Sequence, residues 1–198
     1  MTKKGQTYLI LIFTLSTILA LVFFVFTNHF GVEEESFRIL IRWSAKLAAV
    51  LFAIAFVSSS LDYFFTTRTT KKLLSLRPMI GLSFMVFHTF HLFSLIYLQR
   101  YIHPVFELAK PVSLLAGSIA YFFMYAMAIS TFPYIKRKIP EVLWSGFHTT
   151  GSYWIWVIFF NSYLKNVINK EQYYFLFTLY LIVFILRLAR TSHKYIKK

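Results

Sequence analysis

The chain has 198 residues and a net charge of +14, and 58% of its residues are hydrophobic while only 14% are charged. This composition is far too apolar for a soluble domain of this length and is typical of an integral membrane protein. The sequence contains no cysteine, which excludes disulfides, thiolate-bound iron–sulfur clusters and thiol catalysis.

Six segments reach the roughly 20 apolar residues that a helix needs to cross the core of a bilayer. They cover residues 8–27, 44–65, 78–98, 112–131, 142–163 and 173–189. Only short connectors separate them, so we predict one transmembrane domain over residues 1–198, an all-α bundle of six helices. The first apolar run is too long for the hydrophobic part of a cleaved signal peptide, and we expect it to remain as a helix.

The basic residues lie mainly in alternate connectors, which a chain of membrane-spanning helices places on one side of the membrane. Basic residues cluster before the first segment and after the second, fourth and sixth: Lys3, Lys4, Arg68, Lys71, Lys72, Arg77, Lys136, Arg137, Lys138, Arg187, Arg190, Lys194, Lys197 and Lys198. The positive-inside rule therefore predicts that both termini are cytoplasmic. Membrane orientation and attraction to anionic lipid account for the charge, so we expect lipid and no nucleic acid as a partner.

Three of the six histidines, His88, His91 and His148, lie inside these apolar segments. An ionisable side chain in lipid is costly unless it has a partner, and it marks a functional site. The metal most often bound by imidazole in a cysteine-free membrane helix is haem iron. Alternatively, each could be a neutral histidine that bonds a carbonyl group between helices, and for His88 this structural interpretation is favoured.

The depths of these histidines differ. At 1.5 Å per residue, His91 lies about 21 Å from the cytoplasmic end of its helix, whereas His148 lies only about 10 Å along its own. We therefore expect His91 in the outer half of the membrane and His148 in the inner half, on different irons. His88 stands three residues before His91 on the same helix face, closer to the level of His148, so a His88–His148 pair remains an alternative.

Short motifs surround two of these histidines. The stretch Arg77-x-x-x-Gly81-Leu82 precedes His91, and the basic loop Arg137-Lys138-Ile139 precedes Trp144-x-x-x-His148. From Arg42 to Arg187 the chain resembles the ferric-reductase-like transmembrane domain family. Within that family it is most similar to the MsrQ haem-binding membrane subunits of bacterial periplasmic methionine-sulfoxide reductase systems.

The resemblance implies that the third and fifth helices hold haem b, either one or two, through His91 at the outer site and His148 at the inner site. Arg77 stands where the broader family has a histidine, and it would pair with a haem propionate. The family's fifth-helix ligands are thirteen residues apart, and that position here is Asn161. The resemblance therefore implies that one outer ligand is lost, and that the inner site, which keeps an imidazole and a nearby cation, retains haem more firmly.

The resemblance also implies a bacterial inner-membrane location and passage of electrons to an outer-face partner, such as a molybdenum-dependent methionine-sulfoxide reductase. The sequence has no Gly-x-Gly-x-x-Gly motif, no P-loop and no His-Glu-x-x-His. Six helices leave no room for a flavin or nicotinamide domain, so the electrons would come from a cytoplasmic reductase or a quinone. The sequence does not decide whether the chain itself also binds flavin or quinone.

Two other classes of function remain. One is a haem-free structural or assembly protein with the same fold, which the missing ligand at Asn161 would favour. The other is a small-solute transporter, which is disfavoured because the chain has neither an internal repeat nor a pair of helices broken by Gly or Pro in corresponding halves. An enzymatic role would extend at most to the electron-transferring subunit of an oxidoreductase.

Overall fold

The computed structural model describes residues 2–31, 33–102, 111–168 and 170–196, and over these residues the chain is helical with short connectors and no strand. Six long helices make up most of it: α1 (Lys3–Phe30), α2 (Glu34–Phe65), α3 (Arg68–Tyr97), α4 (Pro111–Thr131), α6 (Glu141–Val167) and α7 (Tyr174–Ile196). Three short elements join them: the π-helix η1 (Leu98–Ile102), α5 (Pro133–Lys136) and the 3₁₀-helix η2 (Glu171–Tyr173).

Five of the helices are long and apolar enough to cross a membrane. They are Lys3–Phe30, Glu34–Phe65, Arg68–Tyr101, Leu114–Thr131 and Glu171–His193. This confirms an all-α chain with the features of a multi-pass membrane protein. The sixth expected span, residues 142–163, lies in α6, which has 27 residues but is not among the five. The reason is a run of small and polar residues in its first half, from Ser145 to Ser152.

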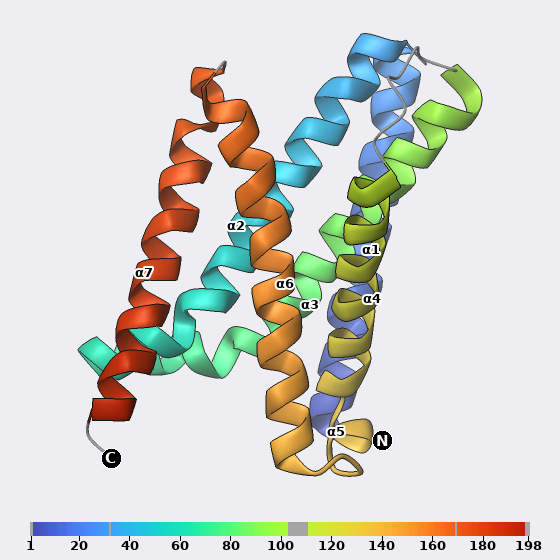
Figure 1. The fold of residues 1–198 in the computed structure, drawn as a ribbon. Coiled ribbons are helices and arrows are strands. Elements are labelled where there is room, and N and C mark those ends of the chain that lie inside the picture. Colours follow the sequence, from blue (N-terminus) through green and yellow to red (C-terminus); the bar gives the residue numbers. More distant parts are fainter. Residues whose placement is uncertain (1, 32, 103–110, 169, 197–198) are drawn as a thin grey trace.

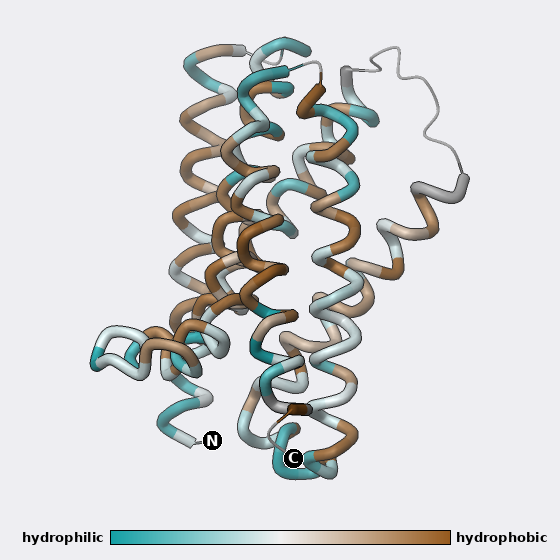
Figure 2. Tube along the Cα trace, turned by 60° about the vertical axis from the view of Figure 1, so that its left-hand side comes forward, coloured by the Kyte–Doolittle hydropathy of each residue, from teal (hydrophilic) through white to brown (hydrophobic). Residues whose placement is uncertain are grey.

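The long helices run side by side as a bundle (Figure 1). One end of the bundle holds both described chain ends, α5 and the turn between α2 and α3. The other end holds the α1–α2 and α6–α7 connections. Hydrophobic residues dominate the middle of the helices, while hydrophilic residues gather toward the two ends (Figure 2). We call the first of these ends the basic end, because it carries Lys3, Lys4, Arg68, Lys71, Lys72 and Lys136 to Lys138.

Local sequence explains the tight connection from α2 to α3. Thr66 ends α2 in the left-handed conformation at φ 43°. Thr67 then caps α3, because its hydroxyl accepts from the Thr70 backbone N–H while the Thr70 hydroxyl accepts from the Thr67 N–H. The first turns of α3 lie across the basic end and its later turns rise along the bundle (Figure 1), and Pro78 lies inside this helix. A proline inside a helix is a common cause of such a change of direction.

The core joins α2, α6 and α7. Tyr180 of α7 is fully buried, and its hydroxyl donates to the Ala49 carbonyl of α2 at 3.1 Å. The indole N–H of Trp156 on α6 donates to the Tyr180 carbonyl at 3.1 Å. These two bonds satisfy buried polar groups in an apolar interior, and they join the three helices around the cavities described below.

Helices α4 and α6 approach each other closely at Gly151. A Cβ atom at this position would lie 2.8 Å from Cδ1 of Phe123 and 3.0 Å from Sδ of Met127. A glycine at a helix interface allows such an approach in membrane bundles. By contrast, nothing lies within 4 Å of a Cβ at Gly146 on the same helix.

We therefore expect Gly151→Leu to lower the free energy of unfolding by about 1–3 kcal/mol, because the added side chain overpacks the α4–α6 contact. Gly146→Leu should leave stability unchanged or raise it slightly, since leucine has the better helix propensity. Thermal unfolding of both variants in one detergent gives the comparison. Equal stability of the two variants would contradict the close α4–α6 approach.

Candidate functional site

Two cavities lie inside the bundle. The inner cavity, toward the basic end, has a volume of about 420 Å³ and is lined by Arg77, His148, Arg187 and Arg190 among mostly apolar side chains. The outer cavity has a volume of about 520 Å³ and is lined by His88, His91, Arg42 and Lys46, again among apolar side chains. Both volumes fall in the range of cofactor and ligand sites, roughly 300–1,000 Å³. Phe84 and Met124 line both cavities, so the two adjoin.

His91 is held by a hydrogen bond between its Nδ1 and the backbone carbonyl of Ile41 on α2, at 3.0 Å. A carbonyl oxygen can only accept, so Nδ1 carries the proton and, in a neutral ring, Nε2 carries the lone pair. This is how metal-binding histidines are usually oriented, with one ring nitrogen bonded to a carbonyl or carboxylate and the other free to coordinate. His91 is thus oriented to present Nε2 as a ligand.

His88 lies in a stack of rings along α3. Its ring centroid is 4.8 Å from that of Tyr121, 5.4 Å from that of Phe84 and 5.4 Å from that of His91. Its Nδ1 is buried and has no hydrogen-bond partner among the described residues. The His88 and His91 rings are nearly parallel, at 13°, and project from one side of one helix. They cannot therefore approach a single iron from opposite faces of a porphyrin.

The wall of the outer cavity that faces α3 comes from α4 and α6. It includes Gly117 and Ser118 on α4 and Phe159 and Ser162 on α6, and no described residue of this wall is a histidine. Asn161, the position implied as the lost ligand, is exposed and does not line the cavity; Ser162 does. Helix geometry accounts for the difference between these two neighbouring positions. At 100° per residue, fourteen residues return to within about 40° of the face of His148, whereas thirteen residues end about 140° away.

His148 is fixed by a network at the basic end. Its Nε2 lies 2.8 Å from the Ser130 hydroxyl, and the Trp144 ring stacks on its own at a centroid distance of 4.0 Å. The Trp144 indole N–H donates to the Ser130 carbonyl at 3.0 Å, and the Lys136 ammonium lies 4.0 Å from the Trp144 ring. The Trp-x-x-x-His spacing thus places two stacked rings one helical turn apart. The Ser130 contact occupies the nitrogen that usually coordinates iron.

The histidines divide between the cavities. His88 and His91 line the outer cavity, and His148 lines the inner cavity. The expectation that His91 and His148 serve different sites agrees with this arrangement. The alternative of a His88–His148 pair on one iron does not, because the two side chains line different cavities.

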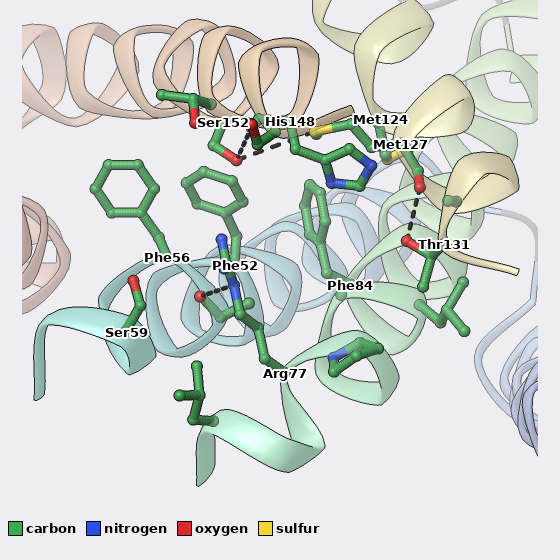
Figure 3. A pocket seen from close by; sticks show the side chains of 18 of the residues that line it. Phe52, Phe56, Ser59, Arg77, Phe84, Met124, Met127, Thr131, His148 and Ser152 are labelled. Carbon is green, nitrogen blue, oxygen red and sulfur yellow. Dashed lines mark hydrogen bonds between the residues drawn. The ribbon is translucent and has the colours of Figure 1, made fainter. Parts of the chain in front are cut away.

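Three arginines converge on the inner cavity, and sequence reasoning singled out only Arg77. Its Nε donates to the Ala55 carbonyl at 3.1 Å, and Figure 3 shows it reaching into the cavity from α3, while His148 enters from α6. Arg187 and Arg190 come from α7, where they stand three residues apart on one face. That spacing, at the end of an apolar segment, is the signal that could have found them.

The described residues form no group of three or more His, Cys, Asp or Glu side chains that could hold a bare metal ion. A haem needs only one or two protein ligands, so this absence does not bear on the expectation of haem. Comparison with protein-family models, with curated proteins and with solved structures found no match to this chain. The functional assignment therefore depends on the chemistry of the two cavities.

Proposed function

We propose that this chain is a haem b electron-transfer subunit of a membrane oxidoreductase, with the outer cavity as its principal haem site. The observation that carries the proposal is His91, whose Nδ1 is anchored to the Ile41 carbonyl and whose Nε2 is left to coordinate. The cavity has room for a cofactor and is mostly apolar. Arg42 and Lys46 at its wall would pair with the propionates.

Haem b would supply reversible one-electron transfer, and the chain's residues would hold and orient it. His91 would be the axial ligand of the outer site, with His88 beside it as the alternative ligand. His148 is the ligand candidate of the inner cavity, with Arg77 as the propionate partner. Because Nε2 of His148 contacts Ser130, the geometry favours His91 over His148, the reverse of the order that the sequence resemblance implied.

Adjoining cavities in one bundle give electrons a short path between the two membrane faces. A cytoplasmic reductase or a quinone would donate at the basic end, and an outer-face oxidoreductase would accept at the other end. The resemblance to the ferric-reductase-like family and its MsrQ subunits supports this direction, with a molybdenum-dependent methionine-sulfoxide reductase as the acceptor and the bacterial inner membrane as the location.

Six crossings with both termini in the cytoplasm are part of this proposal. Helix α6 runs the full length of the bundle beside α4 and α7 (Figure 1), although the small and polar residues from Ser145 to Ser152 lower its hydropathy. Reporter fusions after Lys138 and after Lys198 should both report cytoplasm, and a fusion at Glu34 should report the outside. If α6 does not cross, the fusion after Lys138 will stay cytoplasmic but that after Lys198 will report the outside.

The test of the cofactor is the absorption spectrum of the full chain purified in detergent from haem-supplemented cells. We expect a b-type band that shifts on reduction with dithionite. A folded but colourless preparation would contradict haem binding and favour a structural or assembly role. In that role the Ser130–His148–Trp144 network would serve only to pack α4 against α6.

A further inference from the structure

Among the described residues that line the inner cavity, three are arginines and none is acidic. Arg77, Arg187 and Arg190 all line it, and arginine stays protonated in proteins. The nearest acid along α2, Asp62, accepts a hydrogen bond from the Thr70 hydroxyl at 3.1 Å instead. The described ion pairs are Arg38–Glu34 and Lys136–Glu141, neither of which involves these three arginines.

Helix α2 holds each arginine through one acceptor. The acceptors are the Ala55 carbonyl for Arg77, the Phe56 carbonyl for Arg187 at 2.7 Å and the Ser59 hydroxyl for Arg190 at 2.7 Å. Arg187 is only 7% exposed, and its guanidinium lies 4.2 Å from the Phe56 ring. All three acceptors are neutral, so they position the guanidinium groups without cancelling their charge.

Arg190 has an unsatisfied hydrogen-bond donor in addition to its uncompensated charge. Its Nε is buried and has no hydrogen-bond partner among the described residues, although a guanidinium has five donors. A buried donor without an acceptor is costly, and a charged one costs more. The natural acceptor is an oxyanion, because the planar fork of arginine matches the oxygens of phosphate.

Most of the remaining wall of the inner cavity is apolar, with Phe52, Phe56, Leu74, Leu82 and Trp144 among its residues. The polar residues of this wall are Ser59, Thr131, Ser145, His148, Thr149 and Ser152. A ligand that fits it has an anionic group at the arginines and an apolar body. The cavity also lies toward the basic end, which the positive-inside rule places on the cytoplasmic side. Basic pockets between transmembrane helices on that side are a known setting for the headgroups of anionic lipids.

We propose that the inner cavity is a binding site for the phosphate group of an anionic phospholipid, held by Arg77, Arg187 and Arg190. The site does not depend on haem in the outer cavity. Its chemistry is shared with soluble phosphate compounds, and the apolar wall residues named above favour the lipid as the source. An occupied site would fasten α2, α3 and α7 together through one ligand.

The test is lipid binding by the full chain, delipidated in a neutral detergent and prepared from haem-depleted cells so that no propionate competes. Thermal unfolding is followed during titration with phosphatidylglycerol, with phosphatidylcholine and with inorganic phosphate. We expect phosphatidylglycerol to raise the unfolding temperature strongly, and the other two probes to have little effect at equal concentration.

Arg190→Gln should weaken the apparent affinity for phosphatidylglycerol by about tenfold or more, because it removes a charge-assisted bond. The affinity of Arg190→Lys for phosphatidylglycerol should lie between those of the unmodified chain and Arg190→Gln, because lysine keeps the charge but lacks the planar guanidinium. The matched control is Arg137→Gln, an exposed arginine at the same end but outside the cavity, which should change affinity by less than about twofold. Unfolding without lipid checks that each variant folds.

Three outcomes would overturn the proposal. An equal loss of affinity in Arg137→Gln would mean diffuse surface attraction rather than a site. Equal stabilisation by phosphatidylcholine would show that the protein does not recognise the negative charge of the lipid headgroup. Saturation by inorganic phosphate at the concentration of the lipid would assign the site to a soluble phosphate compound and overturn the lipid source. A colourless protein that still binds phosphatidylglycerol would leave this proposal standing while the haem proposal failed.

Discussion

His91→Ala is expected to lower the haem bound per chain by about tenfold or more. The axial imidazole bond is the strongest single contact of a b haem, and even the hydrogen bonds that orient metal ligands are worth about 10- to 100-fold in affinity. Haem per protein, from the reduced-minus-oxidised spectrum, is the measurement. His29→Ala at the exposed end of α1 is the control and should retain all haem.

The same measurement ranks the other histidines. His148→Ala should remove less haem than His91→Ala, because Nε2 of His148 is bonded to Ser130. Full haem content in His91→Ala, together with a colourless His148→Ala, would move the cofactor to the inner cavity. Haem lost only in His88→Ala would instead identify the buried, unbonded ring of His88 as the ligand.

A gain-of-ligand pair extends this prediction. Ser162→His should place an imidazole in the outer cavity opposite α3 and raise the haem bound per chain, or convert a five-coordinate spectrum to a six-coordinate one. Asn161→His, one residue earlier and outside the cavity, should change neither. Increased binding in Asn161→His alone would mean that the register of α6 differs from the one described.

The second large effect concerns stability. Tyr180→Ala should lower the free energy of unfolding by about 3–5 kcal/mol, because it empties a fully buried ring site and removes the donor to the Ala49 carbonyl. The loss falls on packing, which is what associates helices in a membrane. Tyr180→Phe removes only the hydroxyl and should cost about 1 kcal/mol. Denaturant or thermal unfolding in detergent measures both variants.

Tyr174, on the same helix, supplies the matched control. It is 54% exposed, so Tyr174→Ala should change the free energy of unfolding by no more than about 0.5 kcal/mol. A comparable loss in Tyr174→Ala would show that α7 depends on its outer surface, where another chain or ordered lipid packs. A small loss in Tyr180→Ala would contradict the α2–α7 contact on which the inner cavity depends.

The pattern of apolar and basic residues in the sequence was sufficient to predict the helices and to predict that basic residues gather at one end of the bundle. Each expected span lies within or close to one of the long helices, because long apolar runs have one stable form in lipid, a helix that satisfies its own backbone. The basic clusters mark one end of the bundle, and the Trp144–His148 spacing places their rings in contact, since residues four apart share a helix face. These are local properties of the chain, and local sequence decides them.

Tertiary structure alone decided which side chains share a cavity. Arg187 donates to the Phe56 carbonyl 131 residues away, and no periodicity in the sequence predicts that contact. That Ser162 and not Asn161 lines the outer cavity also depends on how α6 packs against its neighbours, such as the close contact of Gly151 with Phe123 of α4. Spacing along one helix states which residues share a face. Only the neighbouring helices determine whether that face meets a cavity, a packed core or lipid, because helix packing depends on side chains far apart in the chain.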